Sequence, residues 1–321
     1  MHPIVALASH QENLAALVAK ALHNLPNVQS DNGDVSPIPG STISLHAPGR
    51  PAIEKQKPDF VSVTRGPGMR SSLTTGLDTA KGLAVAWQVP LVGVNHMQAH
   101  ALTPRLVSAL NDRADNTNLA HEPQPAFPFL SLLVSGGHTL LLHSSALTTH
   151  TILATTTDIA IGDCIDKTAR LVLPSDITNA TTEIMYGRLL EKFAFPNGSD
   201  DYNYTAPTTR GEEIARKETN WTWALSPPLA ETRSGLKSRS MQYTFSGLGS
   251  AIKRICDNNP TMSTPERIDL AREAFRLTFE HLASRVGWAL TTLSESGQQG
   301  QGVKTLVVSG GVASNGYLRT V

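Results

Sequence analysis

Residues 129–143 read FLSLLVSGGHTLLLH, an apolar run that breaks at Ser135-Gly136-Gly137 and then resumes. Residues 305–311 read TLVVSGG and repeat this design, because an apolar run again leads directly into Ser-Gly-Gly. A short apolar run that ends at a glycine turn is typical of a fully buried β-strand. We therefore expect a strand–turn–strand unit in the first stretch and a buried strand in the second. The duplication predicts two related halves that face one cleft.

Segments with a helical pattern alternate with these strands. In residues 265–294 apolar side chains recur at every third or fourth position, after the helix-start signal Ser263-Thr264-Pro265-Glu266. This pattern predicts a long amphipathic helix. Shorter helices are expected at 11–22, 72–87 and 158–172, and shorter strands at 60–64 and 90–94. The alternation of strands and helices predicts an α/β fold.

The composition is that of a globular protein without net charge. Of 321 residues, 40% are hydrophobic and 17% charged, with 27 Lys plus Arg against 27 Asp plus Glu. Any RNA contact therefore has to come from local basic groups or from a partner. The best candidate is Arg233, Lys237 and Arg239, although a solvated loop is the simpler interpretation. The two cysteines lack C-x-x-C spacing, which argues against a disulfide scaffold. No apolar run approaches the length of a membrane span, so no membrane partner is expected.

Polar stretches rich in Pro, Gly and Ser predict the domain organisation. We expect a first lobe over residues 1–127, with a solvated insertion at 24–58. A second lobe is expected over 128–321, with an insertion or flexible arm at 196–240. Residues 109–125 are expected to form a loop.

His96 and His100 are four residues apart. On a helix their imidazoles share a face and could hold one ion, while the alternative is two ordinary polar residues at a helix end. A zinc protease of the H-E-x-x-H type needs a glutamate directly after the first histidine to activate water. Met97 holds that position, so a metallopeptidase would lack its base.

Glycines after a buried strand let backbone N–H groups approach phosphate or carbonyl oxygens. For either Ser-Gly-Gly turn alone, a tight turn with positive φ is the simpler interpretation. The two copies, one followed by His138-Thr139 and the other by Ala313-Ser314-Asn315, favour a nucleotide cleft. The Gly66-Pro67-Gly68 loop fits either a contact with that cleft or a plain turn.

Residues 162–167, GDCIDK, place two carboxylates at the start of a predicted helix. Asp163 could cap this helix by accepting hydrogen bonds from backbone N–H groups. Asp166 would then lie one turn later on the same face, where it could accept hydrogen bonds from ribose hydroxyls. The alternative is an Asp-Lys pair on a solvated helix.

Taken together and in this order, these segments resemble the threonylcarbamoyl-adenosine tRNA synthase family, formerly called glycoproteases, over residues 60–319. The matching stretches are Arg65–Gly68, His96 with His100, Leu133–Thr139, Gly162–Lys167, Phe245–Leu248 and Ser309–Asn315. The absence of Pro-Gly-Gly after the Asp-Lys helix resembles the organellar branch more than the bacterial one. The resemblance thus implies a mitochondrial protein, with a cytoplasmic one as the alternative.

The resemblance implies an actin-like, Hsp70-like ATPase fold of two α/β lobes. It also implies transfer of a threonylcarbamoyl group from threonylcarbamoyl-AMP to N6 of adenosine 37 in tRNAs reading ANN codons. One divalent metal ion per subunit, of iron, zinc or magnesium, would be held by His96, His100 and a later aspartate. The implied partners are tRNA, threonylcarbamoyl-AMP or ATP, and a second copy of the chain in a homodimer. By similarity, Leu133, Val134, Ser135, Gly136 and Gly137 would line the acyl-adenylate, Asp166 would hold the ribose, and Asn315 would contact the nucleotide from the opposite lobe.

Two family segments have no counterpart here. The family begins with a strand and a Thr-Ser-Cys-Asp-like phosphate loop, and ends with an Asp-Asn pair that supplies the third metal ligand. We therefore expect a fold that is incomplete at both termini, and a weak, open metal site of two imidazoles. The alternatives are a metallopeptidase of the glycoprotease type and a non-catalytic nucleotide-binding scaffold. The whole interpretation depends on His96 and His100 facing the crevice that the two Ser-Gly-Gly turns enclose from opposite walls.

Overall fold

The computed structural model describes residues 3–28, 40–46, 49, 51–114, 122–179, 185–230, 240–295 and 302–321. It is a mixed α/β structure, as expected, in two compact units, Met1–His100 and Ala101–Val321. The second unit includes residues 101–127, within which the Arg105 guanidinium lies 4.2 Å from the centre of the Phe127 ring. Within the described residues, no helix is both long and apolar enough to span a membrane.

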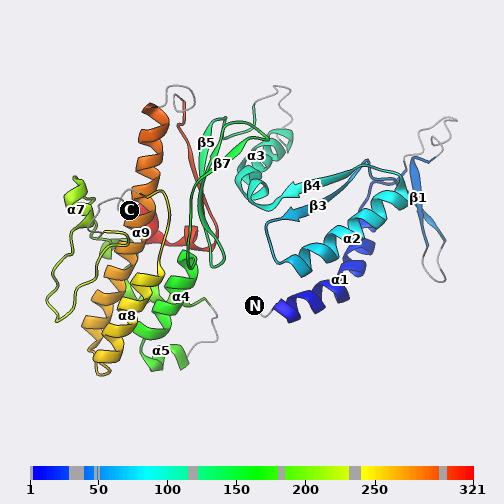
Figure 1. Cartoon of the computed structure of the whole chain (residues 1–321). Helices are drawn as coiled ribbons and strands as arrows, with labels where there is room; N and C mark the ends of the chain where they lie inside the picture. The colour runs from blue at the N-terminus through cyan, green and yellow to red at the C-terminus, as the bar shows by residue number, and fades with distance from the viewer. Residues whose placement is uncertain are drawn as a thin grey trace. The chain divides into compact units, whose positions relative to one another are not determined.

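The first unit is built around one β-α-β crossover. Strand β3 (Val61–Gly66) pairs in parallel with β4 (Leu91–Asn95), and α2 (Arg70–Trp87) connects them. Two parallel neighbouring strands require such a crossover, because the chain has to return to the end of the sheet at which the first strand began. Helix α1 (Pro3–His23) packs against α2 on the side away from the two strands (Figure 1).

The described part of the expected insertion at 24–58 contains regular structure. Strands β1 (Thr42–Leu45) and β2 (Ile53–Gln56) form an antiparallel pair. Lys55 in β2 is buried, and its ammonium group donates hydrogen bonds to the Leu25 carbonyl at 3.0 Å and to Asn27 Oδ1 at 2.7 Å. The sequence did not predict this hairpin, although most of its residues are exposed or half-buried, as in a solvated stretch.

A four-stranded sheet with the order β7-β6-β5-β8 forms the centre of the second unit. Strand β5 (Phe129–Val134) is antiparallel to β6 (Thr139–Ser144), which is antiparallel to β7 (His150–Thr155). Strand β8 (Leu306–Ser309) is parallel to β5, with Leu133 opposite Ser309. All residues of β5 and β6 are buried, as the apolar run predicted. The prediction that the second run is also buried was wrong, because Leu306 and Val308 are exposed in β8, which is an edge strand of the sheet.

This topology corrects one expectation. Because β5 and β8 are parallel and in register, both Ser-Gly-Gly turns lie side by side at the same end of one sheet. They do not come from two halves that face each other, and Asn315 belongs to the same unit as Gly136. The duplicated design reflects two neighbouring strands that end at one edge.

Helices pack together beside this sheet (Figure 1). The long helix α9 (Thr264–Glu295) has the predicted start, since the Glu266 amide donates to Ser263 Oγ at 3.4 Å. Helices α4 (Ile161–Val172), α6 (Tyr186–Ala194) and α8 (Ser246–Asn258) pack against it. The remaining helical elements are α3 (His96–Ala114), α5 (Ser175–Asn179), η1 (Gly198–Asp201), α7 (Arg210–Ile214), η3 (Gly311–Ser314) and α10 (Gly316–Thr320). Helix α3 therefore extends into the stretch 109–125 that was expected to be a loop.

The described part of the segment 196–240 is attached to α9 rather than a free arm. Trp223 is buried, and its indole N–H donates to Glu266 Oε1 at 3.0 Å. Trp221 donates to Asp269 Oδ2 at 2.9 Å. Two indoles contribute large apolar areas to the core, and their N–H groups find carboxylate acceptors on α9. The prediction of an insertion or arm missed this anchoring.

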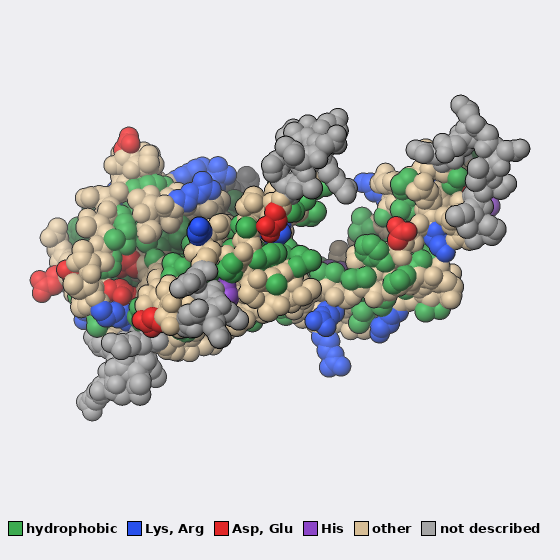
Figure 2. Space-filling model, turned by 90° about the horizontal axis from the view of Figure 1, so that it is seen from above, with side chains coloured by type: hydrophobic (Ala, Val, Ile, Leu, Met, Phe, Trp, Pro, Cys, Tyr) green, Lys and Arg blue, Asp and Glu red, His purple; other side chains and the backbone are tan. Residues whose placement is uncertain are grey.

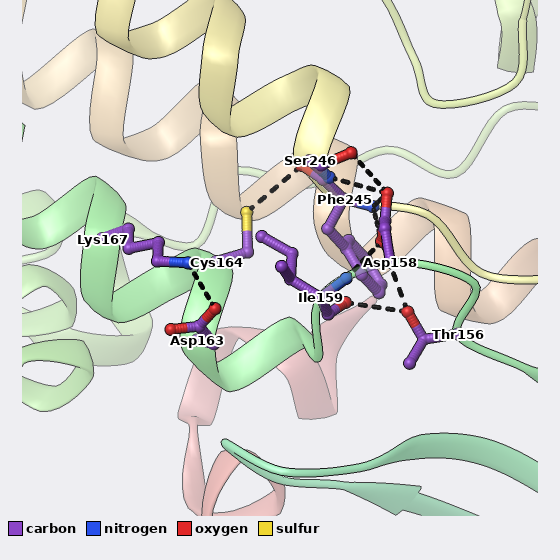
Figure 3. Close-up of polar contacts among 8 residues, drawn as sticks. All are labelled: Thr156, Asp158, Ile159, Asp163, Cys164, Lys167, Phe245 and Ser246. Atoms are coloured by element: carbon purple, nitrogen blue, oxygen red, sulfur yellow. Dashed lines mark hydrogen bonds and ion pairs between the residues drawn. The ribbon is translucent and has the colours of Figure 1, made fainter. Parts of the chain in front are cut away.

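Asp158 attaches the N-terminus of α8 to the turn that follows β7 (Figure 3). Its carboxylate accepts hydrogen bonds from the Phe245 amide at 3.1 Å, the Ser246 amide at 3.1 Å and Ser246 Oγ at 2.5 Å, and also from the Thr244 hydroxyl. Nearby, Cys164 Sγ donates to the Phe245 carbonyl at 3.6 Å, and burial raises the pKa of this thiol to about 12. The thiol therefore joins α4 to α8 as a neutral packing group rather than a nucleophile.

We predict that Asp158→Ala lowers the free energy of unfolding by roughly 1–2 kcal/mol at neutral pH, because the orphan N–H groups of α8 lose their acceptor. Partial burial raises the pKa of Asp158, but hydrogen bonds from Ser246, Thr244 and Phe245 outweigh it and lower the pKa from 3.8 to about 2. A lowered pKa stabilises the fold above the ordinary value, so the contribution is full above about pH 4 and is lost as pH falls towards 2. Urea unfolding at several pH values measures the difference between wild type and variant.

The matched control is Asp257→Ala at the other end of α8. Asp257 forms an exposed pair with Lys253 at 2.7 Å, and such pairs contribute little. A loss of stability that is the same for both variants, or that does not shrink in acid, would contradict the capping role.

Candidate functional site

The two histidines of the H-x-x-x-H segment are positioned by the β4–α3 junction. Asn95, the last residue of β4, accepts hydrogen bonds at Oδ1 from the Met97 amide at 3.0 Å and the Gln98 amide at 3.2 Å. This side chain starts α3 immediately at His96. His100 follows one helical turn later on the same face. The predicted helix is thus present, and its cap explains where it begins.

The geometry of the pair fits a shared metal ion. The Nε2 atoms of His96 and His100 are 3.2 Å apart, and the ring planes are inclined at 81°. Two Zn–N bonds of about 2.0–2.1 Å at a tetrahedral angle place their nitrogens about 3.3 Å apart. Within the described ranges, no third His, Cys, Asp or Glu completes a group that could hold an ion. The pair therefore offers two ligands of a metal site.

Met97, between the histidines, is buried with 6% of its surface exposed. The position at which an H-E-x-x-H protease carries its general base is therefore occupied by an apolar side chain of the core.

A pocket of about 530 Å³ lies in the second unit, where the two Ser-Gly-Gly turns meet α4 and α6. Its walls come from four separate stretches of sequence. The lining residues are Gly136, Gly162, Ile165, Asp166, Met185, Gly187, Arg188, Glu191, Gly311, Val312, Ser314 and Asn315. The volume falls within the range of small-molecule sites.

One wall depends on the close approach of α4 to the first Ser-Gly-Gly turn. A Cβ on Gly162 would lie 2.7 Å from the Gly136 nitrogen and 2.8 Å from the Ser135 carbonyl carbon. The Gly162 amide donates to the Ser135 carbonyl at 3.1 Å, and the Ile161 amide donates to Thr139 Oγ1 at 2.8 Å. Only glycine fits at this contact, which places the first turn of α4 directly beside Gly136.

The second Ser-Gly-Gly turn lies equally close to the end of β5. Gly310 has a φ of 105°, and a Cβ there would lie 2.2 Å from the Val134 carbonyl oxygen. Both the conformation and the space require glycine. After η3, the buried side chain of Asn315 accepts at Oδ1 from the Leu318 amide at 3.0 Å, which orients its amide group at the pocket wall.

Asp166 lines the pocket, whereas Asp163 does not cap α4. The residue before this helix is Ala160, whose side chain makes no capping bond, and Asp163 pairs with Lys167 at 2.7 Å on the exposed face. The prediction of an Asp163 cap was therefore wrong, and the solvated Asp-Lys alternative describes that residue. Asp166 Oδ1 accepts from the Gly187 amide at 3.0 Å, which fixes its carboxylate against α6.

The structure brings together Gly136, Asp166 and Asn315 from the set predicted to bind substrate. Leu133 and Val134 are buried in β5, where their backbone groups take part in the ladders with β6 and β8. Ser135 shapes the turn, because its Oγ accepts from the Gly137 amide at 3.3 Å and from the His138 amide at 3.0 Å. Leu133, Val134, Ser135 and Gly137 thus build the strand end and the turn that present Gly136.

Sequence reasoning missed the contribution of α6. The Gly187 amide donates a hydrogen bond to Asp166. Arg188 and Glu191 lie at the wall of the pocket, and Arg188 is the basic residue among the described residues that line it. A signal was available, since residues 186–194 have apolar positions at helical spacing (Leu189, Leu190 and Phe193) directly after the Asp-Lys helix.

The basic cluster Arg233, Lys237 and Arg239 lies outside the described residues. On the face shown in Figure 2, Lys and Arg side chains of the described part lie in small groups separated by other side chains. The balanced charge of the sequence agrees with this arrangement.

The chain matches the family model TsaD, tRNA N6-adenosine threonylcarbamoyltransferase, over residues 50–321. It is 35% identical over 321 residues to the mitochondrial tRNA N6-adenosine threonylcarbamoyltransferase of Schizosaccharomyces pombe, which covers 99% of this chain and 60% of that protein. A tRNA N6-adenosine threonylcarbamoyltransferase of Nitrosospira multiformis is 30% identical over 82% of the chain and 60% of its own length. A probable mitochondrial one of Arabidopsis thaliana is 32% identical over 81% of the chain and 46% of its own length. The chain therefore spans about three fifths or less of the length of these relatives.

We predict that Gly162→Ala lowers the free energy of unfolding by about 1–3 kcal/mol, although alanine is the better helix former by about 1 kcal/mol. The clash with the Ser135–Gly136 backbone outweighs the propensity, because neither backbone can move without breaking the sheet. Gly287→Ala, on the exposed face of α9 with open space around it, is the control and should stabilise by about 0.5–1 kcal/mol. Urea unfolding measures both, and stabilisation by both variants would disprove the close approach.

Proposed function

The chain belongs to the tRNA N6-adenosine threonylcarbamoyltransferase family, and on this premise we propose that it takes part in threonylcarbamoyl transfer to tRNA. The donor is threonylcarbamoyl-AMP, and the acceptor is N6 of adenosine 37 in tRNAs reading ANN codons. The actin-like, two-lobed ATPase fold belongs to the same proposal, for which the mixed α/β structure and the family match are the support.

The observation that carries the proposal is the convergence of Gly136, Asp166 and Asn315 on one pocket. They come from stretches some thirty and 150 residues apart, and the family resemblance implied all three as contacts of the adenylate. A carboxylate suits ribose hydroxyls, and a glycine turn at a strand end suits a phosphate. Arg188 at the same wall brings N–H donors that can bind phosphate oxygens, beside the carboxylates of Asp166 and Glu191.

In the proposed reaction the N6 amine of adenosine attacks the carbonyl carbon of the threonylcarbamoyl group. The new C–N bond forms, the bond from that carbon to the AMP phosphate oxygen breaks, and the amine loses a proton. AMP leaves as the anion. The residues of this chain act by binding and orienting the adenylate, so the reaction needs no nucleophilic side chain. The neutral Cys164 thiol agrees with that division of roles.

His96 and His100 would hold one divalent ion of zinc, iron or magnesium, and the 3.2 Å between their Nε2 atoms supports this assignment. When bound, such an ion acts as a Lewis acid that polarises a carbonyl oxygen.

The partners in this proposal are tRNA and a second copy of the chain in a homodimer. The proposed compartment is the mitochondrion, because relatives from S. pombe and A. thaliana carry that word in their names.

The direct test is transfer to tRNA. The chain is incubated with unmodified tRNA and freshly synthesised threonylcarbamoyl-AMP, and the modified nucleoside is measured by mass spectrometry after digestion. Formation of threonylcarbamoyl-adenosine above the level without protein is expected. If none forms while AMP still binds, the non-catalytic nucleotide-binding alternative replaces the acyltransferase.

We predict that Asp166→Asn weakens AMP binding about tenfold, because a charged acceptor for ribose hydroxyls becomes a neutral amide. The amide oxygen can still accept from the Gly187 N–H, so the pocket keeps its shape. Asp163→Asn, three residues earlier on the same helix but on its exposed face, should bind AMP as wild type does. Calorimetric titration with AMP measures both, and equal effects would remove Asp166 from the binding site.

We predict that His96→Ala and His100→Ala each lower the affinity for Zn²⁺ at least tenfold, because each removes one of two converging imidazoles. His23→Ala, an exposed histidine of α1 that bonds to the Ala19 carbonyl at 2.8 Å, serves as the control. Competition with a chromogenic chelator measures the affinity independently of activity. Unchanged affinity in the double variant would mean that the pair is not a metal site.

A further inference from the structure

A second, much smaller cavity of the second unit lies where α7 meets α9, two helices that run beside each other (Figure 1). It has a volume of about 10 Å³, which is the scale of one water molecule or one small ion. It shares no lining residue with the pocket of about 530 Å³. The lining residues are Arg210, Glu213, Ile214, Pro227, Pro228, Leu277, Glu280, His281 and Arg285.

Arg285 brings a buried cation to this cavity. Only 1% of its surface is exposed, and its Nη1 donates a hydrogen bond to Ser284 Oγ at 3.2 Å. Its Nε and Nη2 atoms are buried and find no acceptor among the residues that the structure describes. These two atoms form the edge of a guanidinium that binds anions through two parallel hydrogen bonds. A charge at this depth is normally paired, so the free edge of Arg285 points to a ligand.

His281 adds a further donor from one turn earlier on α9, on the same face as Arg285. Its Nε2 accepts a hydrogen bond from the Thr244 amide at 3.2 Å, so the proton of the neutral ring lies on Nδ1. Burial, followed by the charge of Arg285, lowers the pKa of His281 well below its usual value and keeps the ring neutral. Nδ1 is buried and, within the described part of the chain, has no acceptor.

The carboxylates that line the cavity are engaged with other arginines. Glu213 pairs with Arg210, and Glu280 Oε2 accepts a hydrogen bond from Arg276 at 2.5 Å. Among the described lining residues, Glu280 Oε1 is the buried acceptor without a donor. It stands against four N–H bonds without an acceptor, three on Arg285 and one on His281. A buried water makes about three hydrogen bonds and accepts only two of them, so it cannot satisfy all four donors.

Two positive charges also lie close together here. The guanidinium carbons of Arg210 and Arg285 are 4.6 Å and 4.8 Å from the centre of the Trp288 ring. Burial, followed by the charge of Arg210, lowers the pKa of Arg285 to about 10, so Arg285 is still a cation at neutral pH. A negative charge between α7 and α9 would relieve this repulsion.

We propose that the cavity binds one small monovalent anion, of the size of chloride, on the Nε–Nη2 edge of Arg285 and the Nδ1–H of His281. The anion supplies the acceptor that these donors lack and balances the charge of Arg285. The apolar walls strengthen the attraction, because charges interact more strongly where water is excluded. The bound anion stabilises the contact of α7 with α9, and it takes no part in the proposed transfer reaction.

Crystals of the wild-type chain soaked in bromide test the site directly, because bromide replaces chloride and scatters anomalously. An anomalous peak is expected in the cavity, within hydrogen-bond distance of Arg285 Nε and Nη2 and of His281 Nδ1. Density without an anomalous signal, placed between an N–H donor and Glu280 Oε1, would identify a water and overturn the anion site. A cavity without density would overturn it as well.

Urea unfolding at constant ionic strength measures the effect in solution. Replacing gluconate, which is too large for the cavity, by about 200 mM chloride should raise the folding equilibrium constant of the wild type roughly threefold or more. Arg285→Met should abolish this response, and it need not weaken the fold, because an apolar side chain replaces a buried charge. Arg254→Met, at an exposed arginine of α8, is the control and should respond to chloride as the wild type does.

Equal chloride responses in the wild type and Arg285→Met would mean that the ions act elsewhere, and would overturn the proposal. The bromide measurement uses the wild type alone, so it decides the question even if Arg285→Met does not fold. Neither experiment depends on tRNA or AMP, and failure of the anion site therefore leaves the proposed function untouched.

Discussion

The parallel pairing of β5 with β8 is the constraint on which the candidate nucleotide site depends. The two strands are joined in sequence by more than 170 residues, yet Leu133 lies opposite Ser309. The register places both Ser-Gly-Gly turns at one edge of the sheet, and the carboxyl ends of parallel strands are where α/β folds bind ligands. Two further walls of the pocket are attached to this edge. Helix α4 enters beside Gly136, and η3 and Asn315 continue from Gly311.

Glycine is required at this edge for reasons of space as much as of conformation. At Gly162 a Cβ would meet backbone atoms of the Ser135–Gly136 turn, and at Gly310 it would meet the Val134 carbonyl. Backbone atoms cannot move aside as the end of a flexible side chain can. At Gly136 and Gly311, by contrast, a Cβ would have nothing within 4 Å, so there the missing side chain leaves open space at the pocket. The two kinds of glycine have different roles: one permits close packing and the other leaves room for a ligand.

Local patterns in the sequence predicted the parts of the structure that local physics decides. The runs at 129–134 and 139–143 are buried strands, because burial on all sides requires an apolar residue at nearly every position. The pattern at 265–294 is one helix, because burial along one stripe requires apolar residues at every third or fourth position. His96 and His100 converge because a helix alone brings residues four apart together. The anchoring of Trp223 on α9 was not predicted, because it depends on Glu266, 43 positions away. The β1–β2 hairpin was missed because its stretch of sequence shows little hydrophobic periodicity.

The same difference between local patterns and contacts distant in sequence applies to the candidate site. The pattern GDCIDK could not distinguish Asp163 from Asp166, since both are carboxylates near a helix start and either could face a ligand. Only the position of α6 decides between them. The Gly187 amide donates a hydrogen bond to Asp166, whereas Asp163 pairs with Lys167 on the exposed side of α4. Asp158 is a further case, because it is an ordinary acidic residue whose hydrogen-bond donors lie 86 to 88 positions away. Motifs thus predict candidate ligand contacts, while the carboxylates that hold distant backbone segments in place become visible only when the chain is folded.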